Sequence, residues 1–297
     1  MFRSFLVFFL LLAVLPASAE IRMIDALDRE VVLPGPAARV VSLAPHVTEV
    51  VYAAGAGEQL VGAVSYSDYP PAALDVPRVG SYDSVSVESL VALKPDLVLA
   101  WVSGNGPDIV HRLSALGITV YADEPRTLED VARSLRLVGT LTGNEQAANA
   151  EADAFMRTLT DLRQRYSGQQ PVSVYYQIWN EPLLTLNGDH LISDVVRLCG
   201  GTNVFADAVP LVSRISVESV IRKDPQVIVA SGMDKARPEW LDDWRDWTSL
   251  KAVRNEQLYF VPPDILQRHT PRILQGATLL CEQLQQAREH YAGGAGR

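Results

Sequence analysis

The chain has 297 residues, of which 48% are apolar, and it carries a net charge of −9. This composition predicts a globular protein of one large or two medium domains. The excess of carboxylates argues against a nucleic-acid partner, because binding to phosphates requires clustered lysine and arginine.

The first element in the chain is a predicted export signal at residues 1–19. Arg3 provides a positive charge, Phe5–Leu15 is an apolar stretch of eleven residues, and Ala17–Ala19 provides a small-residue cleavage site. At about 1.5 Å per residue, this stretch is too short to cross a hydrocarbon core of about 30 Å. No cysteine follows it directly, so the signal for a bacterial lipid anchor is absent. We expect a soluble mature chain in an exported compartment.

Residues 20–141 are predicted to form an α/β lobe. The lobe begins with an apolar strand at Arg39–Ala44, and glycines at Ala53–Gly57 end its first helix. The segment Ser86–Trp101 then predicts a helix with a serine N-cap, a stop at Lys94-Pro95, and a strand that is apolar on both faces. Strands of that kind occur inside parallel sheets that helices cover on both sides.

The segment Ser86–Trp101 recurs 130 positions later as Ser216–Ser231, without a gap and with six of sixteen residues identical. Such self-similarity indicates that one structural unit occurs twice. The second lobe, at residues 169–291, begins with a strand at Val172–Ile178 and contains a glycine-ended helix at Leu198–Gly201. We therefore predict two Rossmann-like lobes with parallel sheets and a ligand cleft between them.

A single long α-helix is predicted to join the lobes at residues 142–168. Thr142 and Glu145 have the spacing of a capping box, and Gly168 has the position of a C-cap. One apolar stripe marks the buried face of this helix: Phe155, Leu159, Leu162 and Tyr166. Because a helix resists bending, we expect only small rocking motions of the lobes.

Three features of the C-terminal half of the chain remain. Trp240, Trp244 and Trp247 recur at helical spacing, which favours a core-facing amphipathic helix over a ligand platform. The two cysteines favour a disulfide in an exported compartment, with two buried thiols as the alternative: Cys199 and Cys281. Residues 292–297 are predicted to be a disordered tail.

Aromatic and polar residues follow the predicted strands of both lobes, and the carboxyl ends of parallel strands are where ligands bind. In the first lobe these residues are His46, Tyr66, Asp68, Tyr69, Tyr82 and Trp101. In the second lobe they are Trp179, Asn180, Leu211, Asp264 and Arg268. Rings on both walls suit a large, flat, mostly uncharged ligand. The alternative is that each ring caps the core of its own lobe, which we favour for Tyr69 but not for Trp101.

Glu88 and Glu218 occupy the same position in the two copies of the repeat. A carboxylate in the first turn of a helix is favourable whatever the protein does, because it complements the helix dipole. Equivalent positions in two similar lobes, however, also suit two symmetry-related arginines of a dimeric partner. The repeat alone leaves both interpretations open.

Catalytic motifs are lacking, and we expect no enzyme and no cofactor. The sequence contains no G-x-S-x-G, no H-E-x-x-H and no phosphate loop. Its five histidines lack metal-ligand spacing, although His46 and His269 could both face the cleft and keep a metal or haem role open. A hydrolase that uses Asp68 and Asp83 would lack a nucleophile.

Four segments resemble a known family. They are SYSDYPP at Ser65–Pro71, VALKPDLVLAW at Val91–Trp101, LCGG at Leu198–Gly201 and PRILQGATLLC at Pro271–Cys281. The family is that of the periplasmic cobalamin-binding proteins of ATP-driven importers, in which one helix joins two α/β lobes. The resemblance extends from about Arg39 to Leu284. Segments like VALKPDLV also occur in siderophore and haem binders, whereas SYSDYPP with LVLAW and the two cysteines is specific to the cobalamin branch.

The resemblance implies roles for nine residues. Tyr66, Tyr82 and Trp101 would contact the corrin, with Tyr82 in the place of a tryptophan. Asp264 and Arg268 would make polar contacts. Glu88 and Glu218 would dock on arginines of the permease. Cys199 and Cys281 would form a disulfide.

The sequence departs from the family in the second lobe. Ile178, Leu184 and Leu211 stand where the family has aromatic rings, so this wall is expected to be aliphatic. We expect a periplasmic, monomeric capture protein that binds cobalamin or a related corrinoid and delivers it to the dimeric permease of an ABC importer in the inner membrane. The alternative is a haem or ferric-siderophore binder of the same fold.

Overall fold

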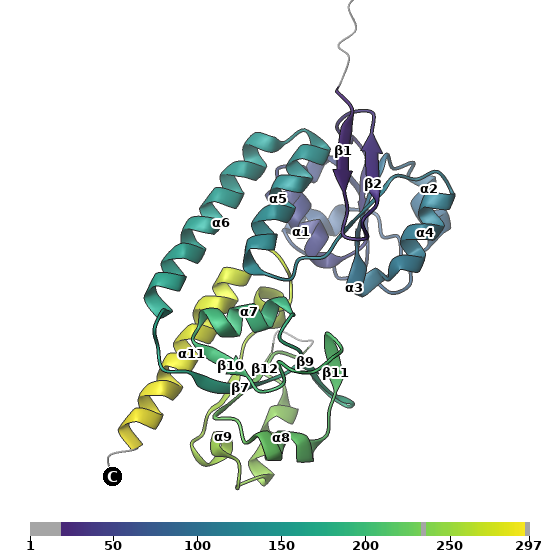
Figure 1. Cartoon of the computed structure of the whole chain (residues 1–297). Coiled ribbons are helices and arrows are strands. Elements are labelled where there is room, and N and C mark those ends of the chain that lie inside the picture. Colours follow the sequence, from purple (N-terminus) through teal and green to yellow (C-terminus); the bar gives the residue numbers. More distant parts are fainter. Residues whose placement is uncertain (1–18, 233–235, 295–297) are drawn as a thin grey trace, which may run out of the picture.

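The computed structural model describes residues 19–232 and 236–294. Nearly all of the predicted export signal therefore lies outside the described residues. Figure 1 shows two lobes, one above the other, with the long helix α6 (Glu145–Tyr166) running along one side of both. In the described part of the chain, no helix combines the length and the hydropathy that crossing a membrane demands.

The first lobe is built on a four-stranded parallel sheet in the order β4-β3-β5-β6. Its strands are β3 (Val40–Ser42), β4 (Leu60–Ala63), β5 (Leu97–Trp101) and β6 (Val120–Asp123). Its helices are α1 (Pro45–Ala53), α2 (Val87–Ala92), α3 (Val102–Asn105), α4 (Pro107–Ala115) and α5 (Leu128–Thr142), with the 3-10 turns η1 (Gly57–Gln59) and η2 (Pro71–Asp75). An antiparallel hairpin precedes the sheet: β1 (Ile21–Ile24) and β2 (Glu30–Leu33).

The second lobe repeats this topology. Its parallel sheet has the order β10-β7-β12-β13, so β12 takes the place that β5 takes in the first lobe. The strands are β7 (Val172–Gln177), β10 (Gly201–Asn203), β12 (Val227–Ala230) and β13 (Leu258–Phe260). All of β12 and most of β5 are buried, as strands that are apolar on both faces require. The duplication that the sequence predicts is confirmed.

The remaining elements of the second lobe surround this sheet. A small antiparallel sheet in the order β11-β9-β8 contains β8 (Trp179–Asn180), β9 (Leu183–Leu186) and β11 (Val212–Arg214). The helices are α7 (Leu191–Leu198), α8 (Val217–Lys223), the 3-10 helix η3 (Glu239–Asp246), α9 (Lys251–Arg254), α10 (Pro263–Leu266) and α11 (Ile273–Gly294).

The two repeat helices begin as predicted. The Ser86 side chain accepts a hydrogen bond from the backbone N–H of Ser89 in α2, and Ser216 accepts one from Ser219 in α8. Each hydroxyl satisfies one of the N–H groups that the first turn of a helix leaves unpaired.

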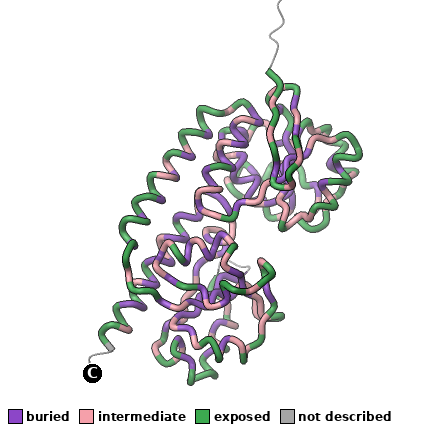
Figure 2. The backbone as a smooth tube through the Cα atoms, in the orientation of Figure 1, coloured by how far each residue is buried: buried purple, intermediate pink, exposed green. Residues whose placement is uncertain are grey.

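The predicted start of the connecting helix is wrong by three residues. Thr142 ends α5, and its hydroxyl donates to the carbonyl of Val138, so it does not cap α6. Gly143 then takes a left-handed conformation (φ +73°) that stops α5, and α6 starts at Glu145. The apolar stripe of α6 is buried as predicted, and Figure 2 shows its opposite face exposed.

Two further expectations need correction. The predicted amphipathic tryptophan helix is the 3-10 helix η3, which ends at Asp246. Trp244 within it is buried, but Trp247, which follows it, is 41% exposed, so the stripe does not face the core as a whole. The disordered tail was predicted to start at residue 292, but α11 continues to Gly294. Residues 295–297 lie outside the described part of the chain.

The division of the chain into lobes at 20–141 and 169–291 stays a prediction, because one apolar core crosses that division. This core combines buried residues of α1 and α5 with those of α6, α7 and α11. A hydrogen bond from the backbone N–H of Leu128 in α5 to Asp194 in α7 (2.9 Å) also joins the two lobes. A shared apolar core of this kind argues against two lobes that move independently.

Candidate functional site at the lobe junction

Four rings from the two lobes pack against one another where the lobes meet. His46, at the start of α1, lies 4.9 Å from Trp101, at the end of β5, in an edge-to-face arrangement. His269 of the second lobe lies 5.8 Å from Trp101 and 5.1 Å from His46, measured between ring centroids. His190, before α7, lies 5.7 Å from His269. These four rings close the inner end of the lobe junction, and we call them the floor rings.

Trp101 is held in place by the short segment that follows it. The side chain of Asn105 accepts a hydrogen bond from the Trp101 backbone N–H (2.7 Å) and donates to the carbonyls of Leu43 and Tyr82 (2.8 and 2.6 Å). A Cβ atom on Gly104 would lie 2.0 Å from the indole ring, so this position requires glycine. Asn105 thus joins the end of β5 to two other segments of the first lobe.

Two predicted ligand contacts are exposed beside the floor rings. The Tyr82 ring is 42% exposed and lies 6.5 Å from Trp101. Tyr66 is 79% exposed, and its backbone takes a left-handed conformation (φ +64°) that non-glycine residues rarely adopt. Rings that gain so little from burial are available for a ligand.

The two predicted polar contacts belong to a charged cluster that joins the lobes. Arg268 lies 2.7 Å from both Glu49 of α1 and Asp68 of the first lobe, and 3.0 Å from Asp264 of its own lobe. Its Nη2 also donates to the Tyr66 carbonyl (3.4 Å). Burial by itself would lower the pKa of the Arg268 guanidinium, but its hydrogen bonds to Glu49 and Asp68 raise that pKa above its usual value.

Sequence reasoning missed two members of this cluster. The Glu49 side chain is only 2% exposed, and Arg272 binds both of its oxygens, at 2.7 and 2.9 Å. Arg272 also lies 3.8 Å from the ring centroid of Tyr69. A signal was available, because Glu49 interrupts the apolar face of α1 between Val47 and Val50. A carboxylate on such a face needs a cationic partner.

The expectation that Tyr69 caps the core of its own lobe is wrong. Its ring is 43% exposed and packs on Arg272 of the other lobe instead. An arginine above an aromatic face is attracted by the electrons of the ring.

Burial keeps the floor imidazoles neutral. It lowers the pKa of His269 to about 4, and it lowers the pKa of His46 well below its usual value. The Nδ1 atom of His269 and the Nε1 atom of Trp101 are buried, and neither has a hydrogen-bond partner among the described residues. The described part of the chain nevertheless contains no group of three or more histidine, cysteine or carboxylate side chains arranged to hold a metal ion.

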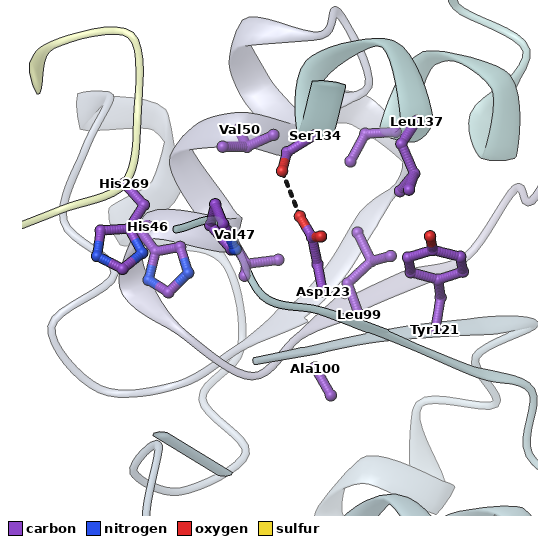
Figure 3. A pocket seen from close by; sticks show the side chains of 12 residues that line it. His46, Val47, Val50, Leu99, Ala100, Tyr121, Asp123, Ser134, Leu137 and His269 are labelled. Carbon is purple, nitrogen blue, oxygen red and sulfur yellow. Dashed lines mark hydrogen bonds between the residues drawn. The ribbon is translucent and has the colours of Figure 1, made fainter. Parts of the chain in front are cut away.

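A small hollow lies beneath the floor rings, between α1, α5 and the first sheet (Figure 3). His46 and His269 border it, and inside it Ser134 donates a hydrogen bond to Asp123. Its volume of about 20 Å³ is enough for a single water molecule. The hollow lies mainly in the first lobe, and neither of the exposed tyrosines Tyr66 and Tyr82 lines it.

The remaining predicted residues lie outside the floor. Ile178, Leu184 and Leu211 are half-buried in the second lobe. Glu88 and Glu218 are exposed on the first turns of α2 and α8. The predicted disulfide is formed, since Cys199 after α7 is bonded to Cys281 in α11, and it closes a separation of 82 residues. A loop of that length stabilises a fold by about 4.5 kcal/mol in the chain-entropy model.

Two lobes of one topology, joined by a long helix and with exposed rings beside their junction, have the architecture of a ligand-capturing protein. The chain belongs to the periplasmic binding protein family, whose model matches residues 40–265.

Two relatives with known names belong to one branch of this family. The chain is 39% identical to the vitamin B12-binding protein of Vibrio cholerae serotype O1 over 257 residues, which is 86% of this chain and 92% of that one. It is 36% identical to the vitamin B12-binding protein of Yersinia pestis over 271 residues, or 91% and 93% of the two chains.

Solved structures of similar proteins show the same fold. The crystal structure of the periplasmic vitamin B12 binding protein BtuF of Vibrio cholerae matches with a TM-score of 0.79 and 38% identity, over 85% of this chain and 98% of that one. The periplasmic heme-binding protein RhuT from Roseiflexus matches with a TM-score of 0.73 over 84% and 98%, but its 24% identity shows the fold alone.

Proposed function

We propose that this protein captures cobalamin or a related corrinoid between its lobes and delivers it to an ABC importer. One observation carries the proposal: Trp101, which lies beside Tyr82 in the first lobe, contacts His269 of the second lobe, next in the chain to Arg268 and its partner Asp264. A corrin offers broad apolar faces to rings and a rim of amides to charged groups. The named relatives support this class of ligand.

The ligand is expected on the solvent side of the floor rings. Tyr66 and Tyr82 are exposed there, whereas the rings below them are packed together. The second wall is aliphatic, but burying about 300 Å² of corrin against it would still contribute roughly 7 kcal/mol before the entropy of association is subtracted.

The proposal also covers the location of the protein and its partner. The export signal would place the mature chain in the periplasm as a monomer that carries out no reaction. Glu88 and Glu218 would dock on arginines of the dimeric permease, because they occupy matching first turns of α2 and α8.

Calorimetric titration with cyanocobalamin, cobinamide and haem tests the ligand class. We expect both corrinoids to bind more tightly than haem. Trp101→Ala should raise the Kd for cyanocobalamin about 30-fold, since truncating a central aromatic contact costs about 2 kcal/mol. Leu116→Ala, which removes an exposed side chain at the C-terminal end of α4, is the control. An unchanged Kd for Trp101→Ala would refute the placement of the corrin.

Haem is the second candidate, and one observation favours it. The buried Nδ1 atom of His269 has no hydrogen-bond partner among the described residues, and neutral imidazole is a common ligand of haem iron. An absorption spectrum of the protein with haem decides the matter. A shifted Soret band in the wild type that is lost in His269→Ala would favour haem.

A further inference from the structure

Glu49 is the one member of the charged cluster that is enclosed by protein. Its side chain is 2% exposed, compared with 38% for Asp68 and 21% for Asp264. Both of its cationic partners, Arg268 and Arg272, come from the other lobe. The carboxylate is therefore satisfied only when the lobes are in contact.

Burying an ionised carboxylate is costly unless it is paired and hydrogen-bonded. Glu49 meets this condition through three hydrogen bonds of 2.7 to 2.9 Å, two from Arg272 and one from Arg268. Separating the lobes would remove all three bonds at once. Glu49 thus favours the closed arrangement and fixes where the two guanidinium groups lie.

We propose that Glu49 is a positioning residue that holds Arg268 at the lobe junction. Asp68 is the partner that Arg268 releases when a ligand binds. This inference rests on the proposed function. Glu49 and Asp68 both accept a hydrogen bond from the same Arg268 nitrogen at 2.7 Å. The two carboxylates therefore differ in the solvent exposure of their side chains and not in their distance from Arg268. An incoming polar group reaches the exposed side of the guanidinium, where Asp68 lies, and leaves the enclosed bond to Glu49 intact.

Arg272 supports this arrangement from the opposite side. It binds both oxygens of Glu49 and lies against the Tyr69 ring, so the carboxylate has little freedom to rotate. A bidentate arginine also imposes a defined geometry on the carboxylate. Arg268 is consequently presented from a rigid base rather than from a flexible side chain.

The test is a set of Kd and dissociation-rate measurements for cyanocobalamin. Glu49→Gln has nearly the same shape without the charge, and it should raise the Kd at least tenfold, mainly through faster dissociation. Asp68→Asn removes the charge that competes with the ligand for Arg268, so it should lower the Kd. Glu58→Gln, an exposed carboxylate of the same lobe, is the matched control and should change nothing. A loss in Asp68→Asn as large as that in Glu49→Gln would overturn the assignment.

A double-mutant cycle separates positioning from general stability. In an Arg268→Gln background, Glu49→Gln should change the Kd less than threefold, because Glu49 acts through Arg268. Additive losses would overturn the proposal. If Glu49→Gln does not fold, Arg272→Gln provides the same test, with a smaller expected loss since one bond to Glu49 remains.

Hydrogen exchange of the ligand-free protein tests the role of Glu49 in lobe contact without any ligand. The amides of residues 268–270 and 272 should exchange at least tenfold faster in Glu49→Gln than in the wild type. If the wild type binds no corrinoid but this effect appears, the ligand assignment fails and the role of Glu49 in lobe contact stands. Unchanged exchange would contradict that role.

Discussion

Tyr66 combines two unfavourable features that an ordinary surface residue avoids. Its ring is 79% exposed, and its backbone has a φ of +64°. The left-handed region costs an L-residue about 1–2 kcal/mol. Strain kept at an exposed aromatic residue is consistent with a ring that serves a ligand rather than the fold.

Two substitutions at Tyr66 test this interpretation. Tyr66→Gly removes the ring and the strain, whereas Tyr66→Ala removes the ring alone, so the glycine variant should be about 1 kcal/mol more stable towards urea. Both variants should bind cyanocobalamin more weakly, and to a similar extent. Wild-type affinity in both variants would exclude the ring from the site, and equal stabilities would argue against strain.

For single residues, the sequence predicted which side chains lie at the strand ends better than it predicted which residues they contact. The rings at strand ends were found because strand ends are recognisable from apolar runs. Asn105 was not singled out, because its hydrogen bonds reach Leu43 and Tyr82, which are 62 and 23 positions away. Such partners leave no local pattern.

Among the elements, the repeated helix and strand were the most predictable. Serine caps and buried strands depend on neighbours within a few residues, and both copies form as expected. The start of α6 was misplaced because Thr142 has a better partner one turn back, in the carbonyl of Val138. A capping motif in the sequence competes with such alternatives.

The matching helices α2 and α8 also carry the docking prediction. Glu88→Lys combined with Glu218→Lys should leave the Kd for cyanocobalamin within threefold and abolish stimulation of the importer's ATPase in proteoliposomes. Reversed charges would repel the arginines proposed to receive them. The control reverses one exposed carboxylate in each lobe away from these helices: Glu58→Lys with Glu282→Lys. If the ATPase response survives in the first double variant, α2 and α8 are not the docking surface.

Across the whole molecule, two kinds of contact join the lobes. The continuous apolar core through α5, α6, α7 and α11 limits how far they separate, and the floor rings and charged cluster close the junction. The α5–α6 contact is reinforced by an ion pair between Glu129 and Arg163. Small rocking motions stay the expectation for such an interface.

The neutral imidazoles make the stability of the molecule depend on pH. Burial lowers the pKa of His269 from 6.5 to about 4, so between these values the unfolded chain binds more protons than the folded one. Stability contributed by the neutral ring is complete above pH 6.5 and falls as the pH drops towards 4. The loss from His269 alone should be about 3 kcal/mol across this window.

Urea unfolding at several pH values between 7.5 and 4 measures this dependence. His269→Gln removes the titrating group and should flatten the profile relative to the wild type. His111→Gln, on the exposed side of α4, should not alter the slope. Parallel profiles for the wild type and His269→Gln would show that the buried neutral imidazole is not responsible.

By itself, the sequence determined the elements, their duplication, the parallel sheets and the disulfide-forming cysteines. These follow from apolar periodicity, caps and a repeat, all of which are set by residues close together in the chain. Only the tertiary structure decided what closes the lobe junction. Glu49 and its arginines are 219 and 223 positions apart, and His46 and His269 belong to different lobes. Contacts of that kind depend on how two finished lobes are placed against each other, and no local pattern in the chain encodes that placement.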